Sequence, residues 1–190
     1  MTNYYELPIE HHLRKPPANL TRSYYAVEVN PWSRRGDIEA AQLFRGTIVS
    51  AYGHVETELS KLCIQISRLD NYAQLVPILP YRMSSRIEFL RRAFAYGPLK
   101  AFGSTTERFL QKFEGMANLR HLMAHSRMDV QPDWGVTFED YRIIDGAITH
   151  RYERFLIKDL EEMARRSARF ARLGQKLKNE LMIQDILPQI

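Results

Sequence analysis

One apolar stripe in residues 37–70 constrains the fold of this chain more than any other feature of its sequence. Val49 and Cys63 widen this stripe, which indicates that other elements pack against it from more than one side. Asp37, preceded by Gly36, is the expected N-cap of the helix that carries it. The spacing alternates between three and four positions, which is typical of one side of an α-helix, at Ile48, Tyr52, Val55, Leu59, Leu62, Ile66 and Leu69.

A second helix is predicted after a loop. Residues 71–83 contain two prolines and are expected to connect the first helix to the next. The apolar period returns over 84–96, where Ser84 or Ser85 is the expected cap. The pair Gly97-Pro98 should end this helix, because proline cannot continue the hydrogen-bond pattern.

The same apolar period predicts two more helices. The third begins near Thr105 or Thr106 and continues to His125, where the helical period stops. The last and long helix is predicted at 156–183, with basic side chains on its outward faces.

A small β-hairpin is expected between the third and the last helix. Residues 135–153 alternate between apolar and polar side chains, and Asp145-Gly146 is a strong signal for a tight turn between two strands. The sequence therefore predicts an all-α fold. Four main helices form an up-down bundle, and the hairpin is inserted before the last of them.

Residues 1–36 differ from the rest of the chain. They contain Pro-rich and basic pieces with scattered tyrosines and no helical period, so we expect an extended N-terminal arm, with a possible short strand in the alternating "YAVEV". The domain organisation predicted from the sequence is an arm at 1–36 and a helical bundle at 37–190.

Several features favour a cytoplasmic protein. No apolar run approaches the ~18 residues of a membrane-spanning helix, and the N-terminus lacks the charged start and apolar stretch of a signal peptide. Cys63 is the lone cysteine, so an internal disulfide is excluded and a reducing compartment is the simplest expectation.

The basic residues are mostly arginine. The chain has 20 arginines against 7 lysines, and its formal net charge is +5. Arginine recognises phosphate better than lysine, because its planar guanidinium donates two parallel hydrogen bonds. This composition favours a nucleic-acid partner, although a solvated and mildly basic surface explains it equally well.

The segment "NLRHLMAHSRM" at 118–128 holds the strongest candidate site. An arginine and a histidine five residues apart, as in Arg120 and His125, are expected by chance in a chain with this many arginines and histidines. Their place at the end of the third helix is more informative, because a charge on the inner side of a helix needs a partner or a site. The alternative is a structural arginine tied to a carboxylate such as Glu56 or Glu58.

A zinc site is a second alternative for this segment. His121 and His125 are four residues apart and share one face of a helix, as in helical zinc sites. No glutamate follows the first histidine and no third ligand is obvious, although His54 and His150 are possible.

The segment "RHLMAH" at 120–125, within this helical pattern, resembles the signature of the HEPN domain family. That signature is an arginine, a polar residue, a few further residues and a histidine, at the end of the third helix of a small bundle. "IVSAYGHVETELSKL" at 48–62 is similar to the first helix of a bacterial subgroup. The resemblance covers about 40–185, and many members with an intact signature are metal-independent ribonucleases that act as toxins or phage-defence effectors.

The resemblance implies a homodimer that cleaves RNA, without a cofactor or metal, through Arg120 and His125. Histidine titrates near neutrality and can act as base or acid, and arginine can stabilise charge on a phosphate. One His125 cannot be both base and acid at once, whereas two chains would supply two. Supporting roles are expected for His121, Ser126 and Glu56, of which Glu56 could pair with Arg120 and orient it. Contacts with RNA are expected from Arg127 and from Arg142 on the hairpin.

The runner-up function is a non-catalytic module of the same type. Members of the family that lack activity bind RNA, a nucleotide or a protein partner. For an active enzyme, the resemblance implies an antitoxin or another defence-system partner besides RNA, and no membrane.

Overall fold

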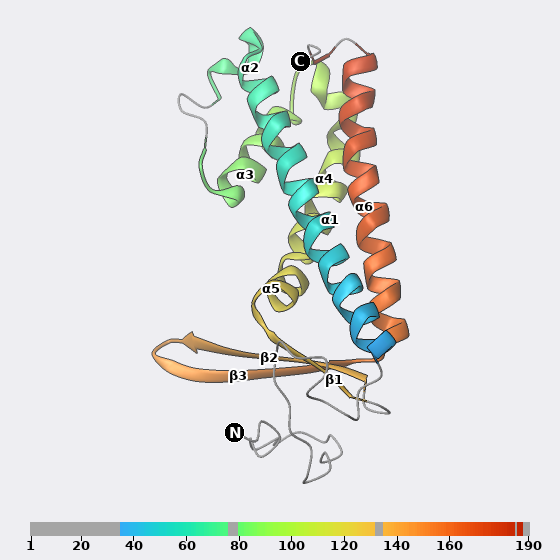
Figure 1. Ribbon diagram of the computed structural model, residues 1–190. Helices are drawn as coiled ribbons and strands as arrows, with labels where there is room; N and C mark the ends of the chain where they lie inside the picture. The colour runs from blue at the N-terminus through green and yellow to red at the C-terminus, as the bar shows by residue number, and fades with distance from the viewer. Residues whose placement is uncertain (1–34, 76–79, 132–134, 185, 188–190) are drawn as a thin grey trace. The chain divides into compact units, whose positions relative to one another are not determined.

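The computed structural model describes residues 35–75, 80–131, 135–184 and 186–187 (Figure 1). This part of the chain is mostly helical and carries one small antiparallel sheet. The predicted arm at 1–36 lies outside the described residues, apart from its last two, which already belong to the first helix. Within the described ranges, no helix has the length and apolar character needed to cross a bilayer.

The elements follow one another as seven helices and three strands in the described chain. They are α1 (Arg35–Ser67), α2 (Asp70–Ala73), α3 (Met83–Ala93), the short 3-10 helix η2 (Pro98–Phe102), α4 (Gly103–Gly115), α5 (Ala117–His125), β1 (Arg127–Gln131), β2 (Gly135–Ile144), β3 (Ala147–Phe155) and α6 (Ile157–Ile183).

The elements form two compact units. The sheet unit consists of the described residues up to Ile48 together with Leu119–Arg165, so it holds the start of α1, α5, the three strands and the start of α6. The helical unit consists of Val49–Asn118 and the described residues from Arg166 onward. The up-down order of four main helices stays a prediction.

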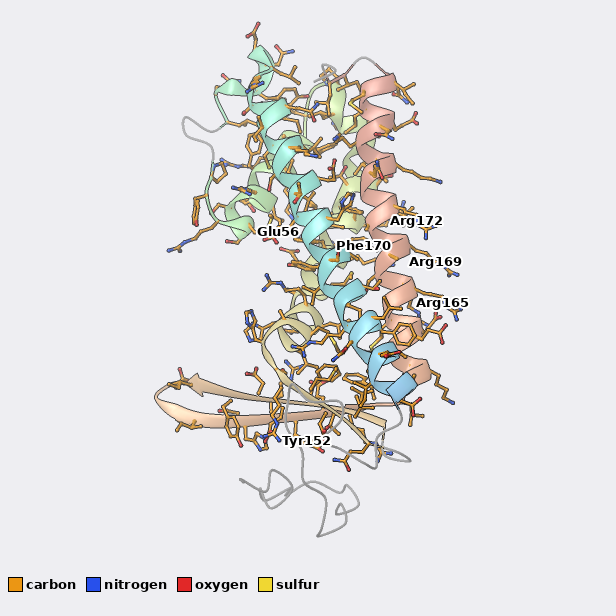
Figure 2. The ribbon with its side chains drawn as sticks, viewed as in Figure 1. Glu56, Tyr152, Arg165, Arg169, Phe170 and Arg172 are labelled. Carbon is orange, nitrogen blue, oxygen red and sulfur yellow. The ribbon has the colours of Figure 1, made fainter. Side chains whose placement is uncertain are left out.

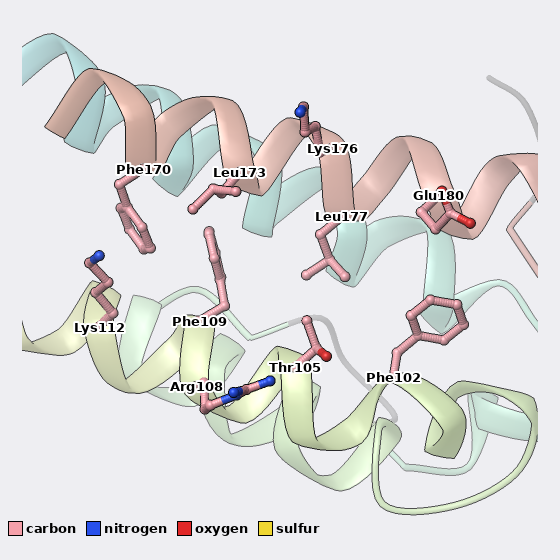
Figure 3. A pocket seen from close by; sticks show the side chains of 10 residues that line it. All are labelled: Phe102, Thr105, Arg108, Phe109, Lys112, Phe170, Leu173, Lys176, Leu177 and Glu180. Carbon is pink, nitrogen blue, oxygen red and sulfur yellow. The ribbon is translucent and has the colours of Figure 1, made fainter. Parts of the chain in front are cut away.

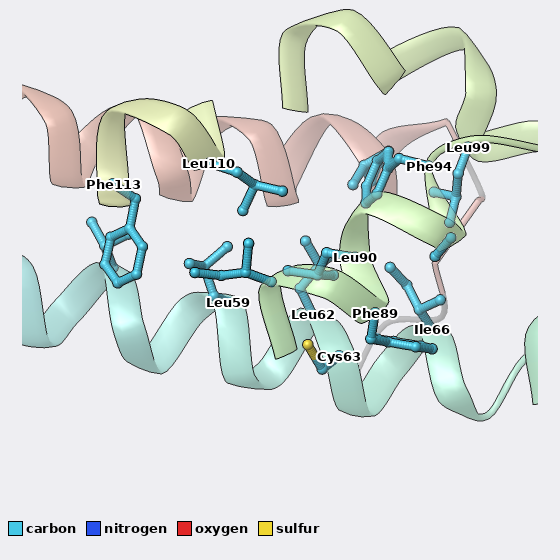
Figure 4. Packing of buried hydrophobic residues seen from close by; sticks show 14 of the residues in the cluster. Leu59, Leu62, Cys63, Ile66, Phe89, Leu90, Phe94, Leu99, Leu110 and Phe113 are labelled. Atoms are coloured by element: carbon cyan, nitrogen blue, oxygen red, sulfur yellow. The ribbon is translucent and has the colours of Figure 1, made fainter. Parts of the chain in front are cut away.

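The helical unit is built on the apolar stripe of α1. Leu59, Leu62 and Ile66 are buried and pack with side chains from α3, α4 and η2 (Figure 4). The ring of Phe113 on α4 stacks on Tyr52 of α1, with centroids 4.5 Å apart. The predicted stripe is therefore the core side of α1.

Cys63 lies inside this core. Its thiol is fully buried, and desolvation raises the pKa of Cys63 to about 12. A thiol that stays protonated is a poor nucleophile and a poor metal ligand, so Cys63 acts as a small core residue.

The predicted third helix is interrupted. It consists of α4 and α5, which meet at Met116. The amide of Met116 donates to both Lys112 O at 3.2 Å and Phe113 O at 3.1 Å, which tightens the last turn of α4. Gly115 precedes the interruption and has a poor helix propensity, which explains why the helix gives way here.

Two predicted helix caps are wrong. α1 begins at Arg35, so Asp37 lies in its first turn, where a carboxylate still favours the positive end of the helix dipole. α3 begins at Met83 after Arg82, and neither Ser84 nor Ser85 precedes it. The predicted break is confirmed: α3 ends at Ala93, and η2 begins at Pro98.

The predicted hairpin is confirmed and extended by a third strand. β2 and β3 pair antiparallel from Val136 opposite Phe155 to Ile144 opposite Ala147. Asp145 and Gly146 form the turn with φ of 51° and 80°, and two positive angles are what a two-residue turn needs to match the twist of the strands. β1 was not predicted, because five residues directly after a helix carry too little alternation to be recognised.

A buried ion pair joins α1 and α6 in the helical unit. Glu58 is buried, and its carboxylate accepts hydrogen bonds from Lys61 at 2.9 Å and from Lys178 at 2.7 Å. Desolvation raises the pKa of Glu58, but the hydrogen bonds and charges of the two lysines outweigh it, so the pKa is lowered overall. Glu58 is thus engaged within the helical unit.

Removal of the buried Phe113 ring from α4 should destabilise the fold. We expect Phe113→Ala to lower the free energy of unfolding by about 3–5 kcal/mol, because it leaves a cavity and removes the stacking on Tyr52. Urea denaturation followed by circular dichroism measures this. Gln175→Ala, at an exposed position of α6, is the control and should change it by less than about 0.5 kcal/mol.

The ion pair of Glu58 should make stability depend on pH. The lowered pKa means that its contribution is complete above the unfolded-state value of about 4.3 and is lost as the pH falls through the folded-state value. We expect Glu58→Gln to cost about 1–3 kcal/mol at pH 7, with a difference from wild type that shrinks below about pH 4. Glu88→Gln, exposed on α3, is the control and should change the free energy of unfolding at pH 7 by less than about 0.5 kcal/mol.

Candidate active site

α5 presents His125 at its end. His125 is the last residue of the helix and is exposed. The amide of Ser126 donates to Leu122 O at 3.0 Å, so the α-helical pattern is kept up to the final turn. Leu122 and Met123 are fully buried and anchor this turn. The histidine of the motif therefore stands in solvent on a fixed helix end.

An arginine of α1 holds the C-terminal end of α5. Nε of Arg45 donates to Met123 O at 2.5 Å, and Nη2 donates to Ser126 O at 2.9 Å. The guanidinium also lies 6.0 Å from the centre of the Phe138 ring on β2. Carbonyl groups at a helix end have no partner within the helix and carry the negative end of its dipole, so a cation stabilises them. Burial lowers the pKa of Arg45, yet a guanidinium stays protonated at neutral pH.

The two histidines of the motif lie together. The ring centroids of His121 and His125 are 4.7 Å apart, as their spacing of one helical turn predicts. Asp140 Oδ2 lies 3.6 Å from Nε2 of His121, with side chains 10% and 43% exposed respectively. This distance is longer than a direct hydrogen bond, but a carboxylate here attracts a proton on Nε2 and favours one ring orientation.

The sheet separates two groups of polar side chains. Successive residues of a strand point to opposite faces, so Phe138 and Asp140 share one face of β2 and Glu139 lies on the other. Arg45 and His121 contact the face of Phe138 and Asp140. The candidate site is therefore on that face.

The opposite face carries a network centred on Glu139. Its carboxylate accepts from Tyr141 at 3.2 Å and lies 3.1 Å from Nε2 of His150. The rings of Tyr141 and His150 stack with centroids 4.6 Å apart. Desolvation and then the charge of Glu139 raise the pKa of Tyr141. Tyr152, labelled on β3 in Figure 2, is the residue paired with Glu139 in the register of the two strands.

Arg127 belongs to this second network. Its Nη1 lies 3.2 Å from Oε2 of Glu139, and its side chain is 13% exposed. It begins β1 directly after the motif, but on the face opposite to Asp140. The proximity in sequence to His125 thus does not place Arg127 on the same side of the sheet, and its contact with RNA stays a prediction.

Arg120 and His125 do not converge within one regular helix. Arg120 is half-buried on α5, and five residues at ~100° each turn it about 140° away from His125. Ser126 is buried, and its Oγ has no hydrogen-bond partner among the described residues, so the supporting role expected of Ser126 stays a prediction. Its backbone oxygen is used instead, by Arg45.

The remaining predicted residues lie elsewhere. Glu56 is half-buried on α1 in the helical unit (Figure 2), whereas Arg120 belongs to the sheet unit, so their predicted pairing stays a prediction. Arg142 lies in β2, and its side chain is outside the described part of the structure.

Among the residues that the structure describes, the zinc alternative has no third ligand near the motif. Across the described ranges, no group of three or more His, Cys, Asp or Glu side chains could hold a metal ion. His150 pairs with Glu139, on the face opposite to His121, and His54 lies on α1 in the helical unit.

The outer side of α6 carries a row of arginines. Figure 2 shows Arg165, Arg169 and Arg172 projecting from the helix. All three are exposed, and Arg165 donates to Glu161 at 2.6 Å. The sequence prediction of basic side chains on the outward faces is confirmed for these arginines and wrong for Lys178, which pairs with buried Glu58. The row leaves positive charge in solvent.

Sequence reasoning missed Arg45 and Asp140. Arg45 lies 78 positions before Met123, so only the folded chain shows that it binds a helix end. Asp140 could have been noticed as a charged residue two positions after Phe138, on the apolar side of an alternating strand. A carboxylate on such a side needs a partner, and His121 provides it.

Comparisons of this chain with models of known protein families, with curated proteins and with solved structures gave no match. The geometry of the site and the sequence resemblance therefore carry the functional argument.

Loss of Arg45 should loosen the end of α5. We expect Arg45→Met to lower the free energy of unfolding by about 1–3 kcal/mol, because the carbonyls of Met123 and Ser126 lose their donors. Hydrogen exchange of the Ser126 amide should accelerate with it. Arg92→Met, at an exposed position of α3, is the matched control. Unchanged exchange and stability in Arg45→Met would show that Arg45 does not hold this helix end.

Proposed function

We propose that the chain is a metal-independent endoribonuclease of HEPN type. It acts as a homodimer, with Arg120 and His125 of both chains around one cleft. The observation that carries this proposal is His125 in solvent at the end of α5, in contact with His121, which Asp140 flanks. A toxin or phage-defence role, with a neutralising or triggering partner, follows from the family resemblance.

The reaction needs three groups. A base removes the proton of the 2′-hydroxyl, whose oxygen attacks the adjacent phosphorus. The bond from phosphorus to the 5′-oxygen then breaks, and an acid protonates this leaving oxygen, so that a 2′,3′-cyclic phosphate and a 5′-hydroxyl result. A cation stabilises the charge that builds on the phosphate oxygens. Histidine and arginine supply all three functions without a metal.

Two chains are needed to supply these groups. One His125 cannot accept and donate a proton in the same step, and Arg120 points about 140° away from it on α5. A two-fold axis brings two copies of one surface together, so His125 of one chain acts as base and that of the other as acid. The guanidinium groups of Arg120 then bind the phosphate.

His121 is a positioning residue in this proposal. Its ring lies against His125 on one side, and Asp140 lies beside it on the other. The side chain of Asp140 is mostly buried, so its carboxylate has little room to turn away from the His121 ring into solvent. This arrangement limits the orientations that His125 can take.

Cleavage should depend on both residues of the motif and not on metal. We expect wild type to cut RNA in EDTA. His125→Ala should lower the rate by about 10²–10⁴-fold, and Arg120→Ala by about 10²–10³-fold. Gel analysis of a labelled RNA gives the rates and identifies the cyclic phosphate end. His54→Ala and Arg172→Ala, both exposed, are the matched controls and should cut like wild type.

A mixed dimer tests the shared site. Wild-type chains and chains with His125→Ala, carried on different tags and purified as the mixed dimer, retain a single His125 in the common cleft. Because this cleft lacks either its base or its acid, we expect the mixed dimer to cleave far more slowly than about half the wild-type rate. Cleavage at about half the wild-type rate would contradict the shared site, and undiminished cleavage by the single variants would refute the assignment.

The non-catalytic alternative gives different results in the same experiments. A module that only binds RNA, a nucleotide or a protein would form a complex without cleavage that depends on His125. Expression of a binding module would not slow the growth of the host cells. Expression of a nuclease should slow their growth unless His125 is changed to alanine.

A further inference from the structure

A groove in the helical unit runs between η2 with α4 on one side and α6 on the other (Figure 3). Its volume is about 600 Å³, which is in the range of pockets for small molecules. All its residues belong to the helical unit, whereas Arg120 and His125 belong to the sheet unit. The lining residues are Phe102, Thr105, Arg108, Phe109, Lys112, Phe170, Leu173, Lys176, Leu177 and Glu180.

The interior of the groove is apolar. The rings of Phe109 and Phe170 stack with centroids 4.5 Å apart, and Leu177 continues the apolar lining (Figure 3). Gly174 permits this arrangement, because a Cβ there would lie 2.9 Å from Cζ of Phe109. Leu173 lines the groove although 51% of it is exposed. An apolar ligand would remove this surface from water, which is favourable.

The rim of the groove is cationic. Arg108, Lys112 and Lys176 line it, against the single carboxylate of Glu180. Glu180 already accepts a hydrogen bond from Gln184 at 2.8 Å. Lys112 lies 5.5 Å from the centre of the Phe170 ring, directly beside the apolar interior.

Two other cations of the helical unit are neutralised by carboxylates, unlike these three. Lys178 pairs with Glu58, and Arg91 pairs with Glu107 and Glu114. Among the described residues, no carboxylate forms an ion pair with Arg108, Lys112 or Lys176. The groove thus combines an apolar interior with uncompensated positive charge at its edge.

We propose that this groove binds an amphipathic carboxylate, an acid with an unbranched apolar chain. The apolar chain of this ligand lies along Phe109, Phe170 and Leu177, and its carboxylate contacts the cations of the rim. From residue 170 to residue 180 the helix rises about 15 Å, which suits a medium-chain fatty acid. This site is independent of the proposed ribonuclease activity.

The lining disfavours a nucleotide. A base needs hydrogen-bond partners for its edge, and a site that leaves these groups without partners loses affinity. Thr105 is the one neutral polar side chain among the lining residues. A fatty chain has no such requirement, so it matches the interior better.

Calorimetric titration with four probes tests whether binding depends on the charge of the ligand's head group and on the length of its hydrocarbon chain. Decanoate, below its micelle-forming concentration, should bind in a saturable way. Decanol should bind roughly tenfold more weakly, and decylammonium should not bind. Affinity should rise by about fourfold for each methylene from hexanoate to decanoate, because each buried methylene adds a constant increment. Equal binding of decanoate and decylammonium would overturn the proposal.

Matched variants locate the site. Lys176→Glu should lower the affinity for decanoate by roughly tenfold. Leu173→Ala should lower the affinity for decanoate more than the affinity for hexanoate. Arg169→Glu makes the same change of charge on α6, at an exposed position that does not line the groove, so it should bind decanoate like wild type. Circular dichroism confirms that each variant is folded. Equal weakening by Arg169→Glu, or no saturable binding of decanoate, overturns the proposal and leaves a protein segment as the occupant.

Discussion

The binding of the Arg45 guanidinium to the end of α5 is the interaction on which the candidate site depends. It satisfies the carbonyls of Met123 and Ser126, neutralises the negative end of the helix dipole and contacts Phe138. α1, α5 and β2 therefore meet at one cation. Because His125 is the last residue of α5, its position is fixed by a residue that never touches it. The proposed chemistry belongs to the motif, and Arg45 holds the helix end that carries it.

The helices and the hairpin were predictable because their signals are local. The stripe of α1 follows from spacing alone, and the turn at Asp145-Gly146 follows from two residues that accept positive φ. The interruption at Met116 was missed, since a glycine inside a periodic helix only weakens the pattern without ending it. Pairings between distant segments, such as Arg45 with Met123, have no local signal. For the same reason the sequence indicated candidate residues for the proposed chemistry but not the contacts that hold them in place.

The three-stranded sheet assigns the charged residues around the motif to two faces. Asp140 lies beside His121, whereas its neighbour Glu139 collects Arg127, Tyr141 and His150 on the other face. A shift of one residue in the register of β2 would exchange these roles, and the turn at Asp145-Gly146 prevents it. The hairpin that follows the motif in sequence thus decides which carboxylate faces the histidines.

The division of the third helix at Met116 leaves the motif on a helix of nine residues. Such a helix does not persist in water without tertiary contacts. His121 and His125 can share one face only after Leu122 and Met123 are buried and the strand with Asp140 has joined, and that strand is made after α5. A chain still emerging from the ribosome therefore carries no working site. For a nuclease of the proposed kind, this order of events would spare the RNA nearest to its own synthesis.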